Sequence, residues 1–243
     1  MTESSTPVSA VPAVGPWQQG TVVGIRSETA RARTLRLQLD EPMIYLPGQH
    51  VVLRLTAPDG YTASRSYSVA SAPDGSAEIE LTVERLEGGE VSGFLHQEVI
   101  VGDQLEVRGP IGQWFVWDGE VPALLIGGGS GVVPLMSMLR FARQHGRADL
   151  LHLVVSVRDP AELYYSTELP GHETAVIYTR RAPEGWLRRA GRIGAQDLSA
   201  PLLAAPRVYV CGSTGFADSV TSVLEDGGVS SDRIRVERFG ATG

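Results

Sequence analysis

Residues 124–139 read LLIGGGSGVVPLMSML, which is an apolar strand, a glycine-rich turn and the beginning of an apolar helix. Glycines let a backbone come close to a pyrophosphate, and the helix start that follows offers unpaired N–H groups with a partial positive charge. The string departs from the usual G-x-G-x-x-G pattern, and a turn that serves only strand–helix packing would also explain it. The stretch therefore predicts a strand–turn–helix unit of a parallel sheet and favours a nucleotide phosphate as its ligand.

The rest of the second half alternates in the same way between apolar strands and helical stretches. We expect strands over 123–126, 151–157, 176–179 and 207–210, with helices over 132–143, 161–168 and 215–225. Near-continuous apolar strands between helices predict a parallel sheet covered on both faces. Ligands of such sheets bind at the carboxyl ends of the strands, so Cys211 and Gly212 are expected beside the glycine turn. A small buried thiol is an equally ordinary role for Cys211.

Shorter strand-like runs, separated by Gly, Pro and Asp, fill residues 20–118. We expect strands over 21–25, 34–39, 50–55, 66–70, 77–85 and 104–107, with one short helix that starts near Ser92. Alternating apolar residues, such as Leu35, Leu37 and Leu39, are typical of half-buried strands. Several such strands at this spacing predict a small antiparallel β-barrel. We therefore predict a flexible tail at 1–18, a barrel domain at 19–118 and an α/β domain at 119–243.

Within the predicted barrel, residues 64–71 read SRSYSVAS and place Arg65 and Tyr67 on one face of a strand. A guanidinium can clamp a phosphate, and a phenol ring two residues away can stack on a flat heterocycle. Further along, residues 88–92 read GGEVS and lead into a helix, which makes a second candidate phosphate site. Each piece alone fits ordinary barrel structure, so the prediction rests on their order along the chain.

Composition narrows the classes of function. All 21 basic residues are arginine and the net charge is −7, which argues against nucleic acid as a partner. The single cysteine excludes an internal disulfide and a cysteine-ligated iron–sulfur cluster, and we predict no metal site. An apolar run of membrane-spanning length and a signal peptide are both missing from the sequence, so we expect a cytoplasmic protein without a membrane span.

Seven short motifs occur in an order that resembles the ferredoxin–NADP+ reductase superfamily over about residues 20–243. They are PGQ (47–49), RSYS (65–68), GGEVS (88–92), GPIG (109–112), GGGSG (127–131), VCGS (210–213) and a Glu–Arg–Phe tail (237–239). The resemblance implies two domains, a flavin-binding antiparallel β-barrel followed by an α/β domain with a parallel sheet that binds a nicotinamide nucleotide. It also favours FAD as the flavin, with FMN left open, and NADPH as the nucleotide, with NADH possible.

The activity implied by this resemblance is that of a flavoprotein oxidoreductase. Hydride passes from the nicotinamide to flavin N5, and single electrons then pass to a separate redox protein, such as a ferredoxin or an oxygenase component. Two alternatives use the same residues. One is a reductase of free flavin or ferric chelates, and the other is a non-catalytic regulatory subunit that binds flavin and nucleotide.

The resemblance further assigns the residues on the flavin side. Arg65 binds the flavin pyrophosphate on the same strand as Ser66, Tyr67 stacks on the isoalloxazine, and Ser68 lies near N5. Phosphate is also held by the loop and helix start at Gly89, Val91 and Ser92. Glu237 lies close to the flavin and Phe239 covers its outer face. Tyr67, Ser68, Cys211 and Glu237 are accordingly the expected catalytic residues.

On the nucleotide side, the resemblance has Gly128, Gly129 and Gly131 shape the crevice and has Cys211 and Gly212 border the nicotinamide. The choice between NADPH and NADH depends on the 2′-phosphate, which arginine recognises well. Three residues at strand ends, Arg158, Thr179 and Arg180, favour NADPH. Asp159 lies close enough to claim a ribose hydroxyl, which leaves NADH open, and solvated arginines at strand ends are the alternative interpretation.

Overall fold

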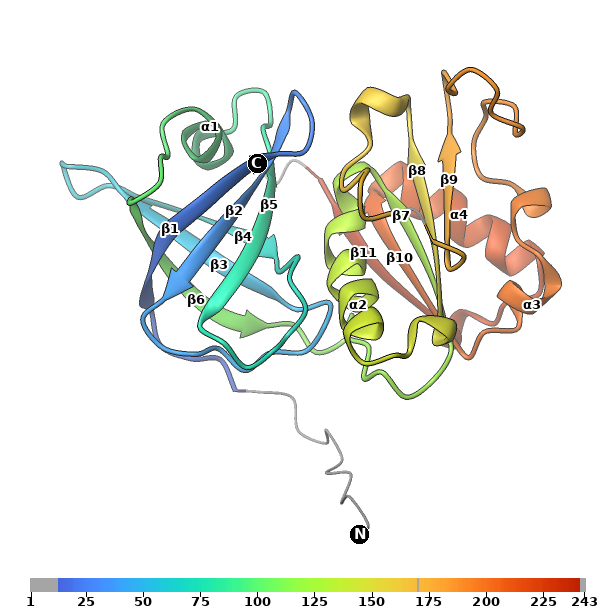
Figure 1. Cartoon of the computed structure of the whole chain (residues 1–243), viewed down its shortest axis with the longest axis horizontal. Coiled ribbons are helices and arrows are strands. Elements are labelled where there is room, and N and C mark those ends of the chain that lie inside the picture. The colour runs from blue at the N-terminus through green and yellow to red at the C-terminus, as the bar shows by residue number, and fades with distance from the viewer. Residues whose placement is uncertain (1–12, 170, 241–243) are drawn as a thin grey trace, which may run out of the picture.

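A computed structural model describes residues 13–169 and 171–240, which form two domains side by side (Figure 1). The first domain contains β1 (Gln18–Ser27), β2 (Ala32–Leu39), β3 (His50–Thr56), β4 (Thr62–Ser68), β5 (Glu78–Glu84), α1 (Glu90–Gln97) and β6 (Gln104–Ile111). The second contains β7 (Ala123–Gly128), α2 (Val132–Gln144), β8 (Leu151–Val157), β9 (Thr174–Tyr178), α3 (Ala200–Leu203), β10 (Arg207–Ser213), α4 (Thr214–Asp226) and β11 (Ile234–Phe239). Residues 1–12 of the predicted tail and residues 241–243 lie outside the described residues.

The first domain is an antiparallel barrel in the strand order β4-β3-β6-β1-β2-β5. A bridge between Val69 and Leu81 joins the chain at the end of β4 to β5 and closes the barrel, and α1 lies across one end (Figure 1). In β2, Leu35 and Leu37 are fully buried while Arg36 between them is exposed. This alternation follows from the two-residue period of a strand. The predicted antiparallel barrel is therefore confirmed.

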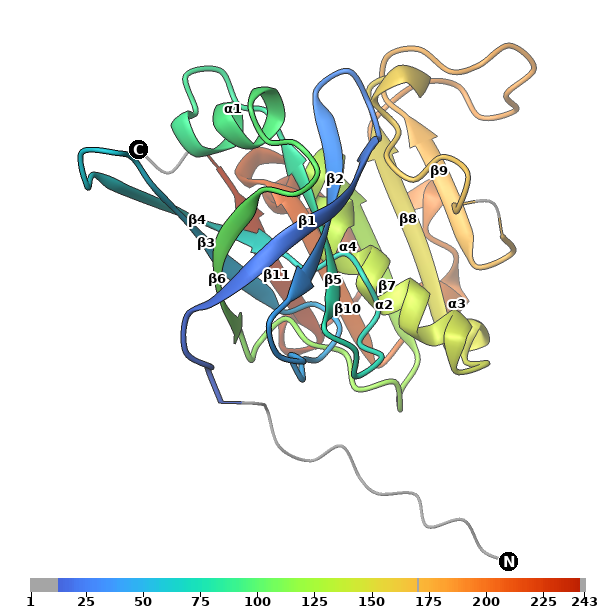
Figure 2. The same cartoon turned by 60° about the vertical axis from the view of Figure 1, so that its left-hand side comes forward.

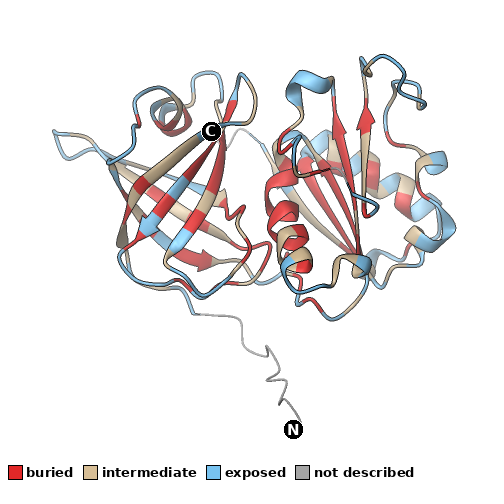
Figure 3. Cartoon of the chain, viewed as in Figure 1, coloured by how far each residue is buried: buried red, intermediate tan, exposed pale blue. Residues whose placement is uncertain are grey.

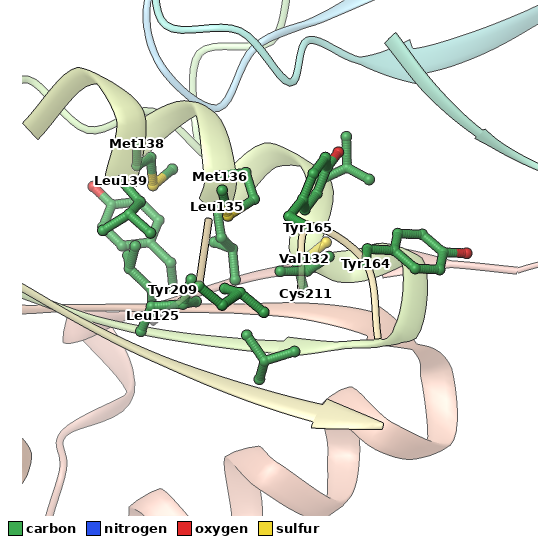
Figure 4. Packing of buried hydrophobic residues seen from close by; sticks show 14 of the residues in the cluster. Leu125, Val132, Leu135, Met136, Met138, Leu139, Tyr164, Tyr165, Tyr209 and Cys211 are labelled. Atoms are coloured by element: carbon green, nitrogen blue, oxygen red, sulfur yellow. The ribbon is translucent and has the colours of Figure 1, made fainter. Parts of the chain in front are cut away.

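The second domain is a five-stranded parallel sheet in the order β11-β10-β7-β8-β9. Its strands are buried along much of their length, with α2 on the face toward the barrel and α4 on the other (Figures 1 and 3). Figure 4 shows how Val132, Leu135 and Leu139 of α2 pack onto the sheet near Leu125 and Cys211. The predicted parallel sheet with helices on both faces is confirmed.

One local prediction is wrong, and one strand was not predicted. The helix expected over 161–168 is wrong, because only a short 3₁₀ turn forms at Pro160–Glu162 and Tyr165 has a φ of 53°. That left-handed conformation cannot continue a right-handed helix. The other element was missed entirely, since β11 alternates charged and apolar residues and reads as a surface segment rather than as an apolar strand. It is the edge strand nearest to the barrel (Figure 1).

None of the helices in the described part of the chain is long and apolar enough to cross a bilayer.

Candidate flavin and nucleotide site

Strand β4 presents Arg65 and Tyr67 on one side, next to their register partners Leu53 and Val51 on β3. The Arg65 side chain is exposed, and its one hydrogen bond within the described structure goes from Nη1 to the Ser64 carbonyl oxygen at 2.7 Å. The Tyr67 ring is half-buried against the barrel core, and this burial raises the pKa of its phenol to about 12. The strand therefore offers a guanidinium and a neutral, apolar ring face in line.

Ser66 and Ser68 lie on the other side of β4, because successive side chains of a strand alternate. Ser66 is exposed and Ser68 is buried. Ser68 pairs in register with His50, which in turn pairs with Ile111 at the end of β6. Ser68 is thus held where β3, β4 and β6 meet, whereas the side chain of Ser66 does not share a face with Arg65 and Tyr67.

The start of α1 provides unpaired donors. The first helical hydrogen bond runs from Gly93 N–H to the Gly89 carbonyl at 2.8 Å, so the N–H groups just before Gly93 have no partner within the helix. Val91 packs into the barrel core, while the Ser92 hydroxyl accepts from Leu86 N–H at 3.2 Å. These two side chains fix the helix in place, and its backbone remains available for an anion.

Tyr61 was not identified as a candidate from the sequence. It lies just before β4, and its hydroxyl donates to Glu90 Oε2 of α1 at 3.2 Å. It is 56% exposed and directly precedes Thr62, the first residue of β4. A groove of about 710 Å³ runs along the exposed side of α1. Arg31, Arg85, Leu86, Gly88, Gly89 and Phe94 are among the residues that line it.

The glycine turn after β7 is packed too tightly for side chains. A Cβ at Gly131 would come within 2.1 Å of the Cys211 carbonyl oxygen, so the start of α2 lies directly against the end of β10. A Cβ at Gly128 would meet the Phe216 ring at 2.7 Å. Gly129, by contrast, has a φ of 55° and open space around it. Gly128 and Gly131 thus serve strand–helix packing, and Gly129 turns the chain with its backbone exposed.

Phe216 is a second residue that was not identified as a candidate from the sequence. It lies in the first turn of α4, where the Ser213 hydroxyl accepts from its N–H at 3.4 Å, and its ring contacts both Gly128 and Gly212. An apolar ring consequently lies at the carboxyl ends of β7 and β10, beside the position expected for a nucleotide. The signal in the sequence was its place three residues after Ser213, a residue type that caps helices.

Cys211 and Glu237 are register partners on the parallel strands β10 and β11. Cys211 is fully buried, and burial together with the nearby Glu237 raises the pKa of its thiol well above the ordinary value. Burial also raises the pKa of the Glu237 carboxyl to about 7. The thiol is therefore neutral and unreactive near neutral pH, whereas the carboxyl is poised to hold or release a proton.

The strand ends of β8 and β9 are tied together by their backbones. Thr179 N–H donates to the Val157 carbonyl at 2.8 Å, and Arg180 N–H donates to the Arg158 carbonyl at 2.9 Å. Both arginine side chains are exposed. Asp159 is partly engaged, since its carboxylate accepts from Ala161 N–H at 3.0 Å. The structure thus brings the three residues expected at the 2′-phosphate to one place.

The two halves of the site lie at one end of the molecule. The carboxyl edge of the parallel sheet and helix α1 share that end in both views (Figures 1 and 2). Phe239, at the end of β11, packs against the core cluster that also contains Cys211. Within residues 13–169 and 171–240, no three His, Cys, Asp or Glu side chains converge to hold a metal ion.

Comparison with known proteins assigns the two domains. Residues 20–116 match the model of the oxidoreductase FAD-binding domain, and residues 125–222 match that of the oxidoreductase NAD-binding domain. The chain belongs to the ferredoxin reductase-like family of FAD- and NAD-binding oxidoreductases. This confirms the predicted family, and it confirms FAD and a nicotinamide nucleotide as the cofactors that its two domains bind.

Family members of known role are similar over most of this chain. A glycine betaine monooxygenase reductase subunit of Chromohalobacter salexigens is 33% identical over 90% of the chain. The ferredoxin–NAD(P)+ reductase component of the naphthalene 1,2-dioxygenase/salicylate 5-hydroxylase systems of a Ralstonia species is 30% identical over 93%. The chain spans 63% of the length of the first and 70% of the second.

Solved structures show the same two-domain fold. The FAD/NAD-binding domain of a nitric oxide dioxygenase from Vibrio cholerae superposes with a TM-score of 0.83 at 25% identity, covering 92% of this chain and 98% of that one. Phthalate dioxygenase reductase has a TM-score of 0.72 at 21% identity, with coverage of 93% and 69%, and supports the fold alone.

Proposed function

We propose that this chain is an NAD(P)H-dependent flavoprotein reductase that passes electrons to a separate redox partner. The observation that carries the proposal is the presence at one end of the molecule of a flavin-type strand, with Arg65 and Tyr67, and a nucleotide-type sheet edge, with Cys211 and Glu237. Family membership supports both halves. A bound flavin supplies the chemistry that converts a two-electron hydride donor into a source of single electrons.

The residues on the barrel fit a flavin dinucleotide. Arg65 and the free N–H groups at the start of α1 would hold the pyrophosphate, and the half-buried ring of Tyr67 would stack on the isoalloxazine. Ser68 would donate or accept a hydrogen bond near N5. The groove beside α1 offers room for an adenosine group, which favours FAD over FMN.

The residues on the parallel sheet would hold the nicotinamide nucleotide. The open turn at Gly129 and the start of α2 would receive its pyrophosphate, and Cys211 would border the nicotinamide as a neutral, close-packed wall. Glu237 would hold a proton close to the flavin, with Phe239 covering the outer face. Because hydride transfer needs near-contact geometry, the protein acts mainly by positioning and by excluding water.

We further propose NADPH as the preferred donor. Thr179, Arg158 and Arg180 lie together at adjacent strand ends, and the two guanidiniums are exposed and suited to a 2′-phosphate. Asp159 already faces donors at both carboxylate oxygens, since Oδ1 accepts from Ala161 N–H and Oδ2 lies 3.9 Å from Arg181 Nη2.

The relatives support a protein acceptor, since they are reductase components of oxygenase systems. We accordingly propose an oxygenase component or a ferredoxin as the partner. We also propose a cytoplasmic location, because the one cysteine is buried and free, as suits a reducing compartment.

Anaerobic titration of the FAD-loaded protein with NADPH and with NADH, followed by visible absorbance, tests the proposal. We expect bleaching of the flavin at about one equivalent of nucleotide, with NADPH acting at lower concentration. A flavin that stays oxidised with both donors would overturn the enzymatic role and favour a regulatory subunit. Sustained turnover with free flavin or ferric complexes, with no added protein, would replace the protein acceptor with a small molecule.

A further inference from the structure

Tyr165 is a buried aromatic residue in a conformation that only glycine adopts readily. Its φ is 53° and 1% of its surface is exposed. Such a backbone persists only where its surroundings hold it in place, and it is found most often at functional sites. Its ring belongs to the core cluster that contains Val132 and Cys211, and its hydroxyl is directed away from the parallel sheet (Figure 4). Tyr165 therefore packs beside Cys211 in the second domain while its hydroxyl faces a partner outside that domain.

That connection is a closed ring of hydrogen bonds to the barrel. The Tyr165 hydroxyl donates to Thr82 Oγ1 at 2.5 Å, and Tyr165 N–H donates to Glu28 Oε2 at 3.0 Å. The hydroxyls of Thr82 and Thr34 bond to each other at 2.7 Å, and Thr34 donates to Glu28 Oε1 at 2.7 Å. Thr34, Thr82 and the Glu28 carboxylate are all buried. The two threonine hydroxyls thus depend on other members of the ring for their partners, whereas the Glu28 carboxylate also accepts from Arg26 Nε at 2.9 Å.

The domains are also joined by a second group of contacts, centred on Arg140 of α2. Its guanidinium donates to Glu168 at 2.6 Å, and to Glu80 at 2.8 Å and the Ala70 carbonyl at 2.9 Å in the barrel. These contacts do not involve the Tyr165 hydroxyl. Loss of that hydroxyl would therefore leave the two domains attached while removing one constraint on how they are oriented.

The hydrogen-bonded ring is connected to the proposed reacting groups in both domains. On the barrel side, Thr82 is adjacent to Leu81, which bridges Val69 directly after the flavin-side Ser68. On the other side, Tyr165 lies on the segment that follows Arg158 at the end of β8, and its ring packs in one cluster with Cys211. A change in this ring of hydrogen bonds would shift Cys211, which borders the proposed nicotinamide site, relative to β4, which carries the proposed flavin site.

We propose that the Tyr165 hydroxyl, with Thr82, Thr34 and Glu28, is a positioning device that sets the separation of nicotinamide and flavin for hydride transfer. The inference rests on the proposed function, because it concerns the distance between its two cofactors. Reacting atoms must approach closely, and a misplacement of about 1 Å lowers a rate by about 100-fold. Tyr165 acts through the orientation of the domains and touches neither cofactor in this proposal.

Stopped-flow reduction of the FAD-loaded protein by NADPH tests this in Tyr165→Phe, Thr82→Val and the double variant. We expect full FAD content, an NADPH dissociation constant within about twofold of wild type, and a limiting reduction rate about tenfold lower in each single variant. The charge-transfer absorbance between nicotinamide and flavin should weaken in parallel. Since Thr82→Val already breaks the bond that Tyr165→Phe removes, the double variant should be no slower than Thr82→Val alone.

Tyr164→Phe is the matched control, because the hydroxyl of this neighbouring buried tyrosine faces Glu84 of β5 and is not part of the ring. It should reduce at the wild-type rate. Unchanged reduction in Tyr165→Phe and Thr82→Val, multiplying effects in the double variant, or an equal loss in Tyr164→Phe would overturn the inference while leaving the proposed function intact. A wild-type protein that binds FAD but is reduced by neither NADPH nor NADH would overturn both.

Discussion

Cys211 and Glu237 lie side by side on β10 and β11, with the thiol fully buried and the carboxyl partly buried. Burial raises the pKa of both groups, and the Glu237 carboxyl, at about 7, is the one that titrates near neutral pH. The pair therefore combines an inert, close-packed wall with a proton-holding group at the edge where the flavin and nicotinamide are proposed to meet.

The stability of the protein should depend on the protonation of Glu237. Its pKa is about 7 when folded and 4.5 ordinarily, so the folded state holds the proton more tightly. That stabilising contribution is fully present below pH 4.5 and is lost as the pH rises through 7. We expect Glu237→Gln to unfold like wild type at pH 5 and to be more stable at pH 8, by roughly 1–3 kcal/mol. Urea unfolding at both pH values measures this, and an equal difference at the two would contradict it.

Tyr67 should control how firmly the flavin is held. In Tyr67→Ala the ring that would stack on the isoalloxazine is lost, so we expect FAD affinity to fall by about tenfold or more. Tyr67→Phe keeps the ring and loses only the hydroxyl, and it serves as the control that should remain yellow. Visible absorbance after gel filtration gives the FAD content. Full colour in Tyr67→Ala would remove the stacking role.

Arg180 should discriminate between the two nucleotide donors. A charge-assisted hydrogen bond to a phosphate contributes about 1.5–3 kcal/mol, so Arg180→Ala should raise the KM for NADPH by about 10- to 100-fold. The KM for NADH, which lacks the 2′-phosphate, should change less than about twofold. Arg36→Ala removes an exposed arginine from β2 of the barrel and should affect neither. Equal increases for both donors in Arg180→Ala would show that the residue does not recognise the phosphate.

Gly131 should tolerate no side chain. An alanine Cβ there would lie 2.1 Å from the Cys211 carbonyl oxygen, a backbone atom that cannot move aside cheaply. We expect Gly131→Ala to lower the free energy of unfolding by about 1–3 kcal/mol. Gly93→Ala is the control, because it lies inside α1 with open space around it and should stabilise by about 0.5–1 kcal/mol. Chemical denaturation compares the two, and an undisturbed Gly131→Ala protein would refute the packing argument.

Local patterns were enough to predict the two sheets and most of their strands. The run 151–157 was predicted as a strand with the bounds that the structure shows, because a continuous apolar segment between polar turns has few other stable states. The strand after Tyr61 was predicted too late, at residue 66, since residues 62–65 are mostly exposed and lack an apolar pattern. β11 escaped prediction for the same reason, as its charged residues hide a partly buried strand.

The sequence by itself determined the order of the two domains, the glycine turn, and which strand carries Arg65 and Tyr67, because these depend on residue type and short-range periodicity. Only the tertiary structure decided the contact of Phe216 with Gly128 and the ring that joins Tyr165 to Glu28, two residues 137 positions apart. Periodicity shows which face of a helix or strand is buried, but it does not show which other element packs against that face. Polar side chains such as Thr34 and Thr82 are ordinarily exposed, so their burial against the second domain follows from how the domains pack rather than from any local pattern.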